Sequence, residues 1–91
     1  MKKYILVVYD IKDDKKRYKL AKNLLRFGTR TQKSVFEALV SEKELKEIEK
    51  LAKKYSSKKD IVTVYILKER HYREAVRFGD VEYLEIDDFI I

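Results

Sequence analysis

The 91-residue chain contains no cysteine, no proline and only two glycines. Because thiols are missing, disulfides, thiolate metal sites and a cysteine nucleophile are all excluded. His71 is the only histidine, so one chain cannot supply a histidine metal cluster or a triad that depends on histidine. The glycines, Gly28 and Gly79, do not form a phosphate-binding glycine loop.

Long hydrophobic runs are also missing. No stretch approaches the roughly 18 apolar residues of a membrane span. The short apolar stretch after Lys2 and Lys3 runs straight into Asp10 and lacks a small-residue cleavage site, which argues against a signal peptide. We therefore expect a cytoplasmic protein without membrane contact. The length suits one small domain, residues 1–91.

Positive charge is concentrated in the first part of the chain, although the net charge of the whole chain is only +6. Residues 1–36 carry eleven basic and three acidic side chains, whereas residues 37–91 carry eleven basic and thirteen acidic ones. This asymmetry favours a polyanionic partner for the first part, and a different partner or a self-contact for the acidic end. A solvated surface explains most lysine-rich small domains, so charge alone does not establish nucleic-acid binding.

The first strand is predicted over Lys2–Tyr9. Six apolar or aromatic residues, 4–9, run without a break, which is typical of a strand covered on both faces or central in a sheet. Asp10 follows directly, at the place where a strand meets solvent and where loops build sites. The alternative is that Asp10 is a turn residue or a second cap for the next helix.

Two amphipathic helices are predicted. The first runs from Asp14 to Phe27, with Asp13 as its N-cap and Gly28 at the position of a C-terminal capping glycine. The second runs from Glu42 to Tyr55 and begins with a capping box at Ser41.

The remaining segments favour strands. Residues 30–40 are expected to form one long, bent or bulged strand, because no Gly, Pro or Asn-Gly pair marks a tight hairpin. Ile61–Leu67 is the clearest strand, and residues 70–78 fit a short helix or a strand. Two short strand-like pieces, residues 81–86 and 89–91, end the chain.

This order, β-α-β-α-β with extra strand at the C-terminus, predicts an α+β fold. We expect a ferredoxin-like sandwich, with a mostly antiparallel sheet and two helices on one face. The tail, residues 87–91, is too apolar to be left in water, so we expect it to pair with a sheet edge of its own or of a second subunit. A homodimer is therefore predicted.

Asp10 is the main candidate for chemistry. A single carboxylate is an incomplete Mg²⁺ site, because Mg²⁺ takes six oxygens and commonly uses waters and substrate phosphates. A two-fold dimer would bring a second Asp10, and the metal would then polarise a phosphoryl oxygen and activate water. Arg17 and Arg30 are candidate phosphate clamps, although surface charge also explains each of them. Tyr9 is the aromatic residue that stands apart from core spacing, and base stacking is its candidate role.

Two segments resemble motifs of a known family. Val7–Ile11 is similar to the first strand and metal-binding Asp of the small CRISPR-associated nuclease family, the second universal spacer-acquisition protein and partner of the integrase. Gly28–Glu37, GTRTQKSVFE, is similar to its G-x-R-x-Q-x-S-V-F-E signature. Asp14 and Arg17, in the first helical turn, also fit, and the match spans nearly the whole chain.

The resemblance implies a symmetric ferredoxin-like homodimer in which Asp10 of each subunit binds Mg²⁺, or another divalent cation, at the interface. It implies metal-dependent endonuclease cleavage of RNA or DNA phosphodiester bonds in CRISPR adaptation. It also implies a non-catalytic role as a bridge that holds the integrase subunits and the DNA to be inserted. The residues expected to contact nucleic acid are Tyr9, Lys15, Arg17, Lys19, Arg30 and Lys33, and those expected to support the site are Ser34 and Phe36.

Four hypotheses follow. The leading one is a metal-dependent endonuclease of CRISPR adaptation, and the second is an integrase adaptor in which Asp10 is structural. The third is a toxin-type ribonuclease of the same fold. The fourth, a ligand-binding regulatory domain, is disfavoured by the basic first helix and by the absence of a glycine-rich ligand loop.

Overall fold

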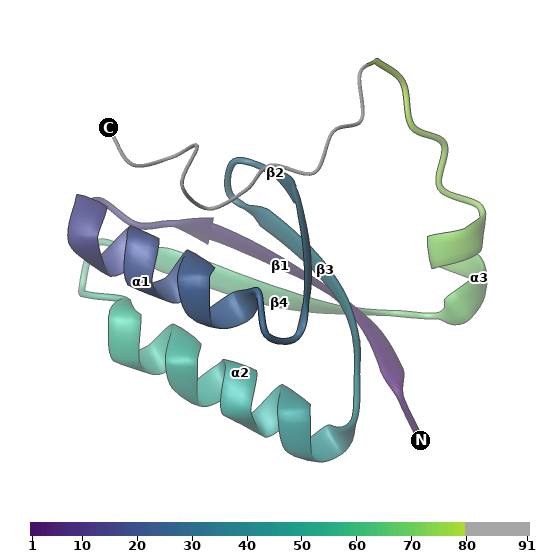
Figure 1. The fold of residues 1–91 in the computed structure, drawn as a ribbon, viewed down its shortest axis with the longest axis horizontal. Coiled ribbons are helices and arrows are strands. Elements are labelled where there is room, and N and C mark those ends of the chain that lie inside the picture. The colour runs from purple at the N-terminus through teal and green to yellow at the C-terminus, as the bar shows by residue number, and fades with distance from the viewer. Residues whose placement is uncertain (80–91) are drawn as a thin grey trace.

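A four-stranded antiparallel sheet forms the centre of the computed structural model, which describes residues 1–79 (Figure 1). Its strand order is β2-β3-β1-β4. The elements in chain order are β1 (Lys3–Asp10), α1 (Asp14–Leu24), β2 (Gly28–Gln32), β3 (Val35–Val40), α2 (Glu42–Tyr55), β4 (Ile61–Leu67) and α3 (Glu69–Arg73). The predicted ferredoxin-like α+β fold is confirmed. Between α1 and α2 the structure has two strands, β2 and β3, where the predicted order has one.

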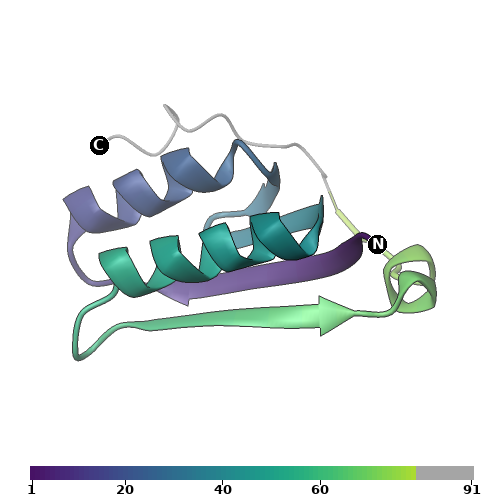
Figure 2. The same ribbon diagram turned by 90° about the horizontal axis from the view of Figure 1, so that it is seen from below.

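Both long helices lie on the same face of the sheet (Figure 2). β1 is paired on both sides, with β3 and with β4. This position confirms the predicted alternative of a strand central in the sheet. Its alternate residues Ile5, Val7 and Tyr9 are buried beneath the helices. The helices bury Leu20, Ala21 and Leu24 of α1 and Leu45 and Ile48 of α2.

The predicted helix starts are confirmed. The backbone N–H of Lys16 donates to Oδ2 of Asp13 at 2.9 Å, so Asp13 caps α1. At α2, the N–H of Glu44 donates to Ser41 Oγ at 3.2 Å, and Glu44 Oε1 accepts from the N–H of Ser41 at 2.9 Å. This reciprocal pair is the capping box that the sequence predicts.

Residues 30–40 form two strands, so the prediction of one long strand is wrong. β2 and β3 pair antiparallel around a turn at Lys33 and Ser34, and their register shifts between Arg30 and Gln32. No non-glycine residue in the described part of the chain has a positive φ. The turn therefore avoids the left-handed conformations that Asn or Gly would signal, and a bulge absorbs the mismatch instead.

Gly28 does not cap the first helix, contrary to prediction. α1 ends at Leu24 and a turn follows, so Gly28 is already the first residue of β2. A Cβ placed on Gly28 would lie 2.2 Å from the carbonyl oxygen of Glu37 and 2.6 Å from Cβ of Ala38. The glycine is needed for the close approach of β2 to β3.

The face of the sheet opposite α1 and α2 presents the other half of β1, namely Tyr4, Leu6 and Val8. Leu39 and Tyr65 lie beside these residues in the register and are 43% and 51% exposed. This set is called the open face below. Its Tyr4 ring stacks on Tyr72, with ring centres 4.5 Å apart.

The end of the described chain contains α3, so the alternative of a short helix within residues 70–78 is the one observed. The predicted strands at 81–86 and 89–91, and the pairing of the tail, fall outside the described residues. Within residues 1–79, no helix is long and apolar enough to cross a membrane.

Candidate functional site

Asp10 is the last residue of β1 and lies opposite Ile61 in the register with β4. Its side chain is 67% exposed. The ammonium group of Lys12 lies 3.2 Å from Oδ1 and 3.1 Å from Oδ2, so it contacts both carboxylate oxygens. Because side chains alternate along a strand, Asp10 belongs to the same side as Tyr4, Leu6 and Val8 of the open face.

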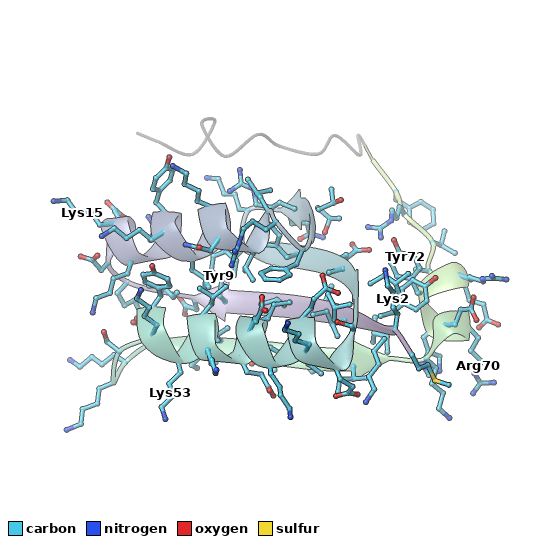
Figure 3. The ribbon with its side chains drawn as sticks, turned by 60° about the horizontal axis from the view of Figure 1, so that its bottom comes forward. Lys2, Tyr9, Lys15, Lys53, Arg70 and Tyr72 are labelled. Carbon is cyan, nitrogen blue, oxygen red and sulfur yellow. The ribbon has the colours of Figure 1, made fainter. Side chains whose placement is uncertain are left out.

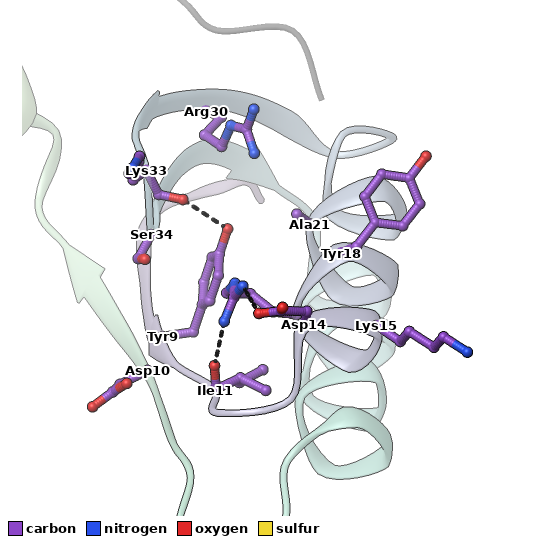
Figure 4. Close-up of a pocket in the computed structure, with 11 residues that line it drawn as sticks. Tyr9, Asp10, Ile11, Asp14, Lys15, Tyr18, Ala21, Arg30, Lys33 and Ser34 are labelled. Carbon is purple, nitrogen blue, oxygen red and sulfur yellow. Dashed lines mark hydrogen bonds and ion pairs between the residues drawn. The ribbon is translucent and has the colours of Figure 1, made fainter. Parts of the chain in front are cut away.

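A hollow of about 650 Å³ lies beside Asp10, between the end of β1, the first turns of α1 and the β2–β3 turn (Figure 4). It gathers seven of the predicted site residues: Tyr9, Asp10, Lys15, Arg17, Arg30, Lys33 and Ser34. Its other lining residues are Ile11, Asp14, Tyr18 and Ala21. Four cationic and two anionic side chains line the hollow, so its lining carries net positive charge.

Two of the predicted residues lie elsewhere. Lys19 is exposed on α1 and is not part of the lining. Phe36 is buried in the core, where its ring lies 6.2 Å from that of Tyr9, centre to centre. Phe36 therefore supports the site from below, as expected of a structural residue.

Tyr9 belongs to the core, contrary to the prediction that it stacks on a base. Only 3% of it is exposed, and Figure 3 shows it beneath the helices, whereas Lys15 and Lys53 extend outward. Its hydroxyl donates to the carbonyl oxygen of Lys33 at 3.1 Å, and its N–H donates to that of Ser34 at 3.1 Å. Tyr9 therefore ties the β2–β3 turn to the end of β1.

The phenol of Tyr9 stays neutral near pH 7. Burial raises its pKa above the ordinary value of 10.0, and this effect outweighs the positive charge of Arg30, a hydrogen bond with Arg30 and the charge of Arg17. A neutral phenol can still donate the hydrogen bond to Lys33 on which the position of the turn depends.

Arg30 is 2% exposed, so it is not the solvent-facing phosphate clamp that the sequence suggests. It lies opposite Phe36 in the register, on the side of the sheet that the helices cover. Its charge acts on the Tyr9 phenol within this buried layer. We assign Arg30 a supporting position beneath the hollow.

Arg17 keeps a position suited to a clamp. Its Nη1 donates to the carbonyl oxygen of Ile11 at 2.9 Å, and its Nη2 forms an ion pair with Asp14. These contacts hold a half-buried guanidinium at the wall of the hollow. A guanidinium has five N–H donors, so donors remain for an anion such as phosphate.

The other acidic residues near Asp10 are committed to contacts that shape the chain. Asp13 caps α1, and Asp14 pairs with Arg17. Asp60 accepts from the backbone N–H of Lys12 at 2.9 Å and from that of Ser57 at 2.7 Å. The pKa of Asp60 is lowered, mainly by the hydrogen bond from Lys12 and next by the one from Ser57. Among these carboxylates, Asp10 is the one that contacts an exposed lysine side chain, that of Lys12.

Sequence reasoning missed Asp60 and the role of Lys12. No local pattern could have found them, because the two residues are 48 positions apart and meet only through the fold. Within residues 1–79, no group of three or more His, Cys, Asp or Glu side chains could hold a metal ion. In the described part of the chain, the carboxylates at this hollow are Asp10 and Asp14, and Asp14 is paired with Arg17.

Comparison with known proteins places these features in context. The family model "CRISPR associated protein Cas2" matches residues 1–75. A "CRISPR-associated endoribonuclease Cas2 2" of Synechocystis sp. is 39% identical over 88 residues, which are 94% of this chain and 95% of the relative.

Solved structures agree with the sequence comparison. The crystal structure of a hypothetical protein, TT1823, from Thermus thermophilus is similar, with a TM-score of 0.79, 30% identity and coverage of 90% of this chain and 96% of that one. A chain of a partial Cas6-RT-Cas1–Cas2 complex is similar with a TM-score of 0.66 and 26% identity, covering 82% of this chain and 89% of that one.

Proposed function

Because the chain belongs to the Cas2 family of CRISPR-associated proteins, we propose that it acts in CRISPR adaptation as a metal-dependent endonuclease that cleaves RNA or DNA phosphodiester bonds. The observation that carries the proposal is the exposed Asp10 carboxylate at the end of β1, beside a hollow lined by Lys15, Arg17 and Lys33. The family match favours this function over the toxin-type ribonuclease and the regulatory domain.

Asp10 would hold the metal. Carboxylate oxygens suit Mg²⁺, which commonly binds one or two protein carboxylates and completes its shell with water and substrate phosphate. A bound Mg²⁺ would polarise the scissile phosphoryl group and lower the pKa of an attacking water. The chain's own residues would bind and orient the strand, with the Arg17 guanidinium and the Lys15 and Lys33 ammonium groups on backbone phosphates. Tyr9 would keep Lys33 in place by holding the turn.

A homodimer formed through the open face would complete this site. The alternate β1 residues Tyr4, Leu6 and Val8, with the exposed Leu39 and Tyr65, give an apolar surface suited to a second copy. Asp10 ends the same row of side chains, so a two-fold contact over this face would bring two Asp10 carboxylates toward each other. The metal would then bind between subunits.

A Tyr65→Glu variant tests the dimer. A buried charge at an apolar contact is strongly unfavourable, so we expect the variant to elute as a monomer where the wild type is a dimer, by light scattering after size exclusion. A Lys53→Glu variant changes an exposed residue of α2, on the side of the molecule away from the open face, and should leave the molar mass in solution the same as that of the wild type. A monomeric wild type would contradict the dimer.

The catalytic proposal is tested by assaying wild type and Asp10→Asn on single-stranded RNA and double-stranded DNA, with and without Mg²⁺. We expect cleavage by the wild type only with metal, and a loss of this metal-dependent cleavage in Asp10→Asn with nucleic-acid binding retained. Glu49→Gln, which removes an exposed carboxylate on α2, is the matched control. Undiminished cleavage by Asp10→Asn would refute the role of Asp10.

The second candidate function is an adaptor that bridges integrase subunits and DNA. The similarity to a chain from a complex that contains Cas1 and Cas2 favours it, as does the basic first part of the chain. Spacer acquisition that continues unchanged in Asp10→Asn cells, while cleavage in vitro is lost, would favour the adaptor. In either role, nucleic-acid binding should fall steeply as salt rises, and a flat salt profile would argue against backbone contacts by the lysines and arginines.

A further inference from the structure

Lys12 lies where a cation would bind Asp10. Its ammonium nitrogen is nearly equidistant from the two carboxylate oxygens, at 3.2 and 3.1 Å. Both side chains are about two-thirds exposed, 65% for Lys12 and 67% for Asp10. The contact is therefore an accessible ion pair that an incoming ion can open.

The fold holds the backbone of Lys12 in place while leaving its side chain exposed. The N–H of Lys12 donates to one oxygen of Asp60, and the N–H of Ser57 donates to the other. Lys16 adds a hydrogen bond of 2.7 Å from its ammonium group to Ser57 Oγ. These contacts tie the loop after β1 to the loop before β4, so the Lys12 stem starts from a fixed point two residues from Asp10.

We propose that Lys12 is an internal counter-ion of Asp10 that competes with the divalent cation and thereby weakens metal binding in the nucleic-acid-free protein. The proposal rests on the proposed metal-binding function of Asp10. Its physical basis is that one carboxylate cannot hold the Lys12 ammonium and a metal ion in the same place. Once displaced, the ammonium group remains beside the metal, where a substrate phosphate is the anion it would meet.

The size of the competition follows from the exposure of the pair. Exposed ion pairs are weak and are screened by salt, so removing Lys12 should tighten metal binding by about two- to fivefold at low ionic strength. The gain should shrink as salt is added, because screening already weakens the pair in the wild type.

Mn²⁺ serves as the probe, with free Mn²⁺ measured by electron paramagnetic resonance during titration of the protein. The variants are Lys12→Met, Lys15→Met and Asp10→Asn, together with the double variant Lys12→Met/Asp10→Asn. Lys15 also lines the hollow, so Lys15→Met controls for the loss of one positive charge nearby. We expect tighter binding in Lys12→Met, a change of less than about 1.5-fold in Lys15→Met, and loss of binding in both variants that lack the Asp10 carboxylate.

Each outcome decides the matter. If Asp10→Asn loses Mn²⁺ but Lys12→Met binds no more tightly than wild type, the metal site stands and the counter-ion role of Lys12 is wrong. Equal tightening in Lys15→Met would likewise overturn the specific role of Lys12 in favour of general electrostatics. If Asp10→Asn binds as well as wild type, or if neither wild type nor Lys12→Met binds, both the metal site and the counter-ion are refuted. Binding by Lys12→Met alone would support the proposal most directly.

Discussion

Replacing Gly28 by alanine should separate β2 from β3. The added methyl carbon would lie 2.2 Å from the carbonyl oxygen of Glu37, 2.6 Å from Cβ of Ala38 and 2.9 Å from its Cα. Contacts of a Cβ below 3.0 Å essentially never occur. None of the three atoms is the far end of a flexible side chain, so one strand has to move.

The magnitude follows from two opposing effects. Forcing extra volume into a packed region typically costs about 1–3 kcal/mol. Alanine restricts the unfolded chain more than glycine does, which returns about 0.4–1 kcal/mol where the native φ suits it. Gly28 does not have a positive φ, so that gain applies. The net expectation is a destabilisation of about 1–2 kcal/mol.

Urea and thermal unfolding, followed by circular dichroism at one fixed protein concentration, measure the effect. We expect a melting temperature lower by about 5–15 °C and a urea midpoint lower by about 1 M. Thr29→Ala is the matched control, since Thr29 is exposed on the same strand. The reasoning would be refuted by a Gly28→Ala protein as stable as wild type, because the two strands would then have room for a side chain.

Three further changes test individual contacts. Tyr9→Phe removes the donor to the Lys33 carbonyl and should cost about 1 kcal/mol; an unchanged urea midpoint would show that this hydrogen bond does not hold the turn. Ser41→Ala breaks the capping box of α2 and should also cost about 1 kcal/mol, which a lower melting temperature would show. A loss of only a few tenths of a kcal/mol would contradict this expectation. The pKa of Asp60 is lowered by backbone hydrogen bonds, so its stabilisation is present above the ordinary value of 3.8 and is lost as the pH falls below that value through the folded-state pKa. Asp60→Asn should therefore flatten the pH dependence of stability below about pH 4, and equal slopes in variant and wild type would contradict this.

The parts of the fold that rest on neighbouring residues could be predicted from sequence. The Asp13 cap, the Ser41 capping box and the bounds of α2 depend on contacts within one helical turn, and all of them were predicted correctly. The hairpin of β2 and β3 was missed because its turn uses ordinary φ angles and a bulge. Gly28 was misinterpreted because its reason lies on the facing strand.

In the candidate site too, features set by neighbouring residues could be predicted, and features set by contacts between distant segments could not. The exposed position of Asp10 after an apolar run follows from local pattern. Burial of Tyr9 and Arg30 does not, because it depends on the helices covering this face of the sheet and on β3 pairing beside β1. The contact between Lys12 and Asp60 joins loops 48 residues apart, which no single-sequence pattern records.

The alternation of β1 also restricts how this protein can change in length. Tyr9 faces the helices and Asp10 the opposite side because successive residues of a strand alternate between its faces. Inserting or deleting one residue between Tyr4 and Tyr9 would exchange the two roles, sending the acid toward the core and the phenol to the outside. A change of two residues would return Tyr9 and Asp10 to their original sides of the sheet, but it would displace the end of the strand from the hollow. Homologues should therefore differ freely in the identity of the apolar residues before Asp10, while their number stays fixed.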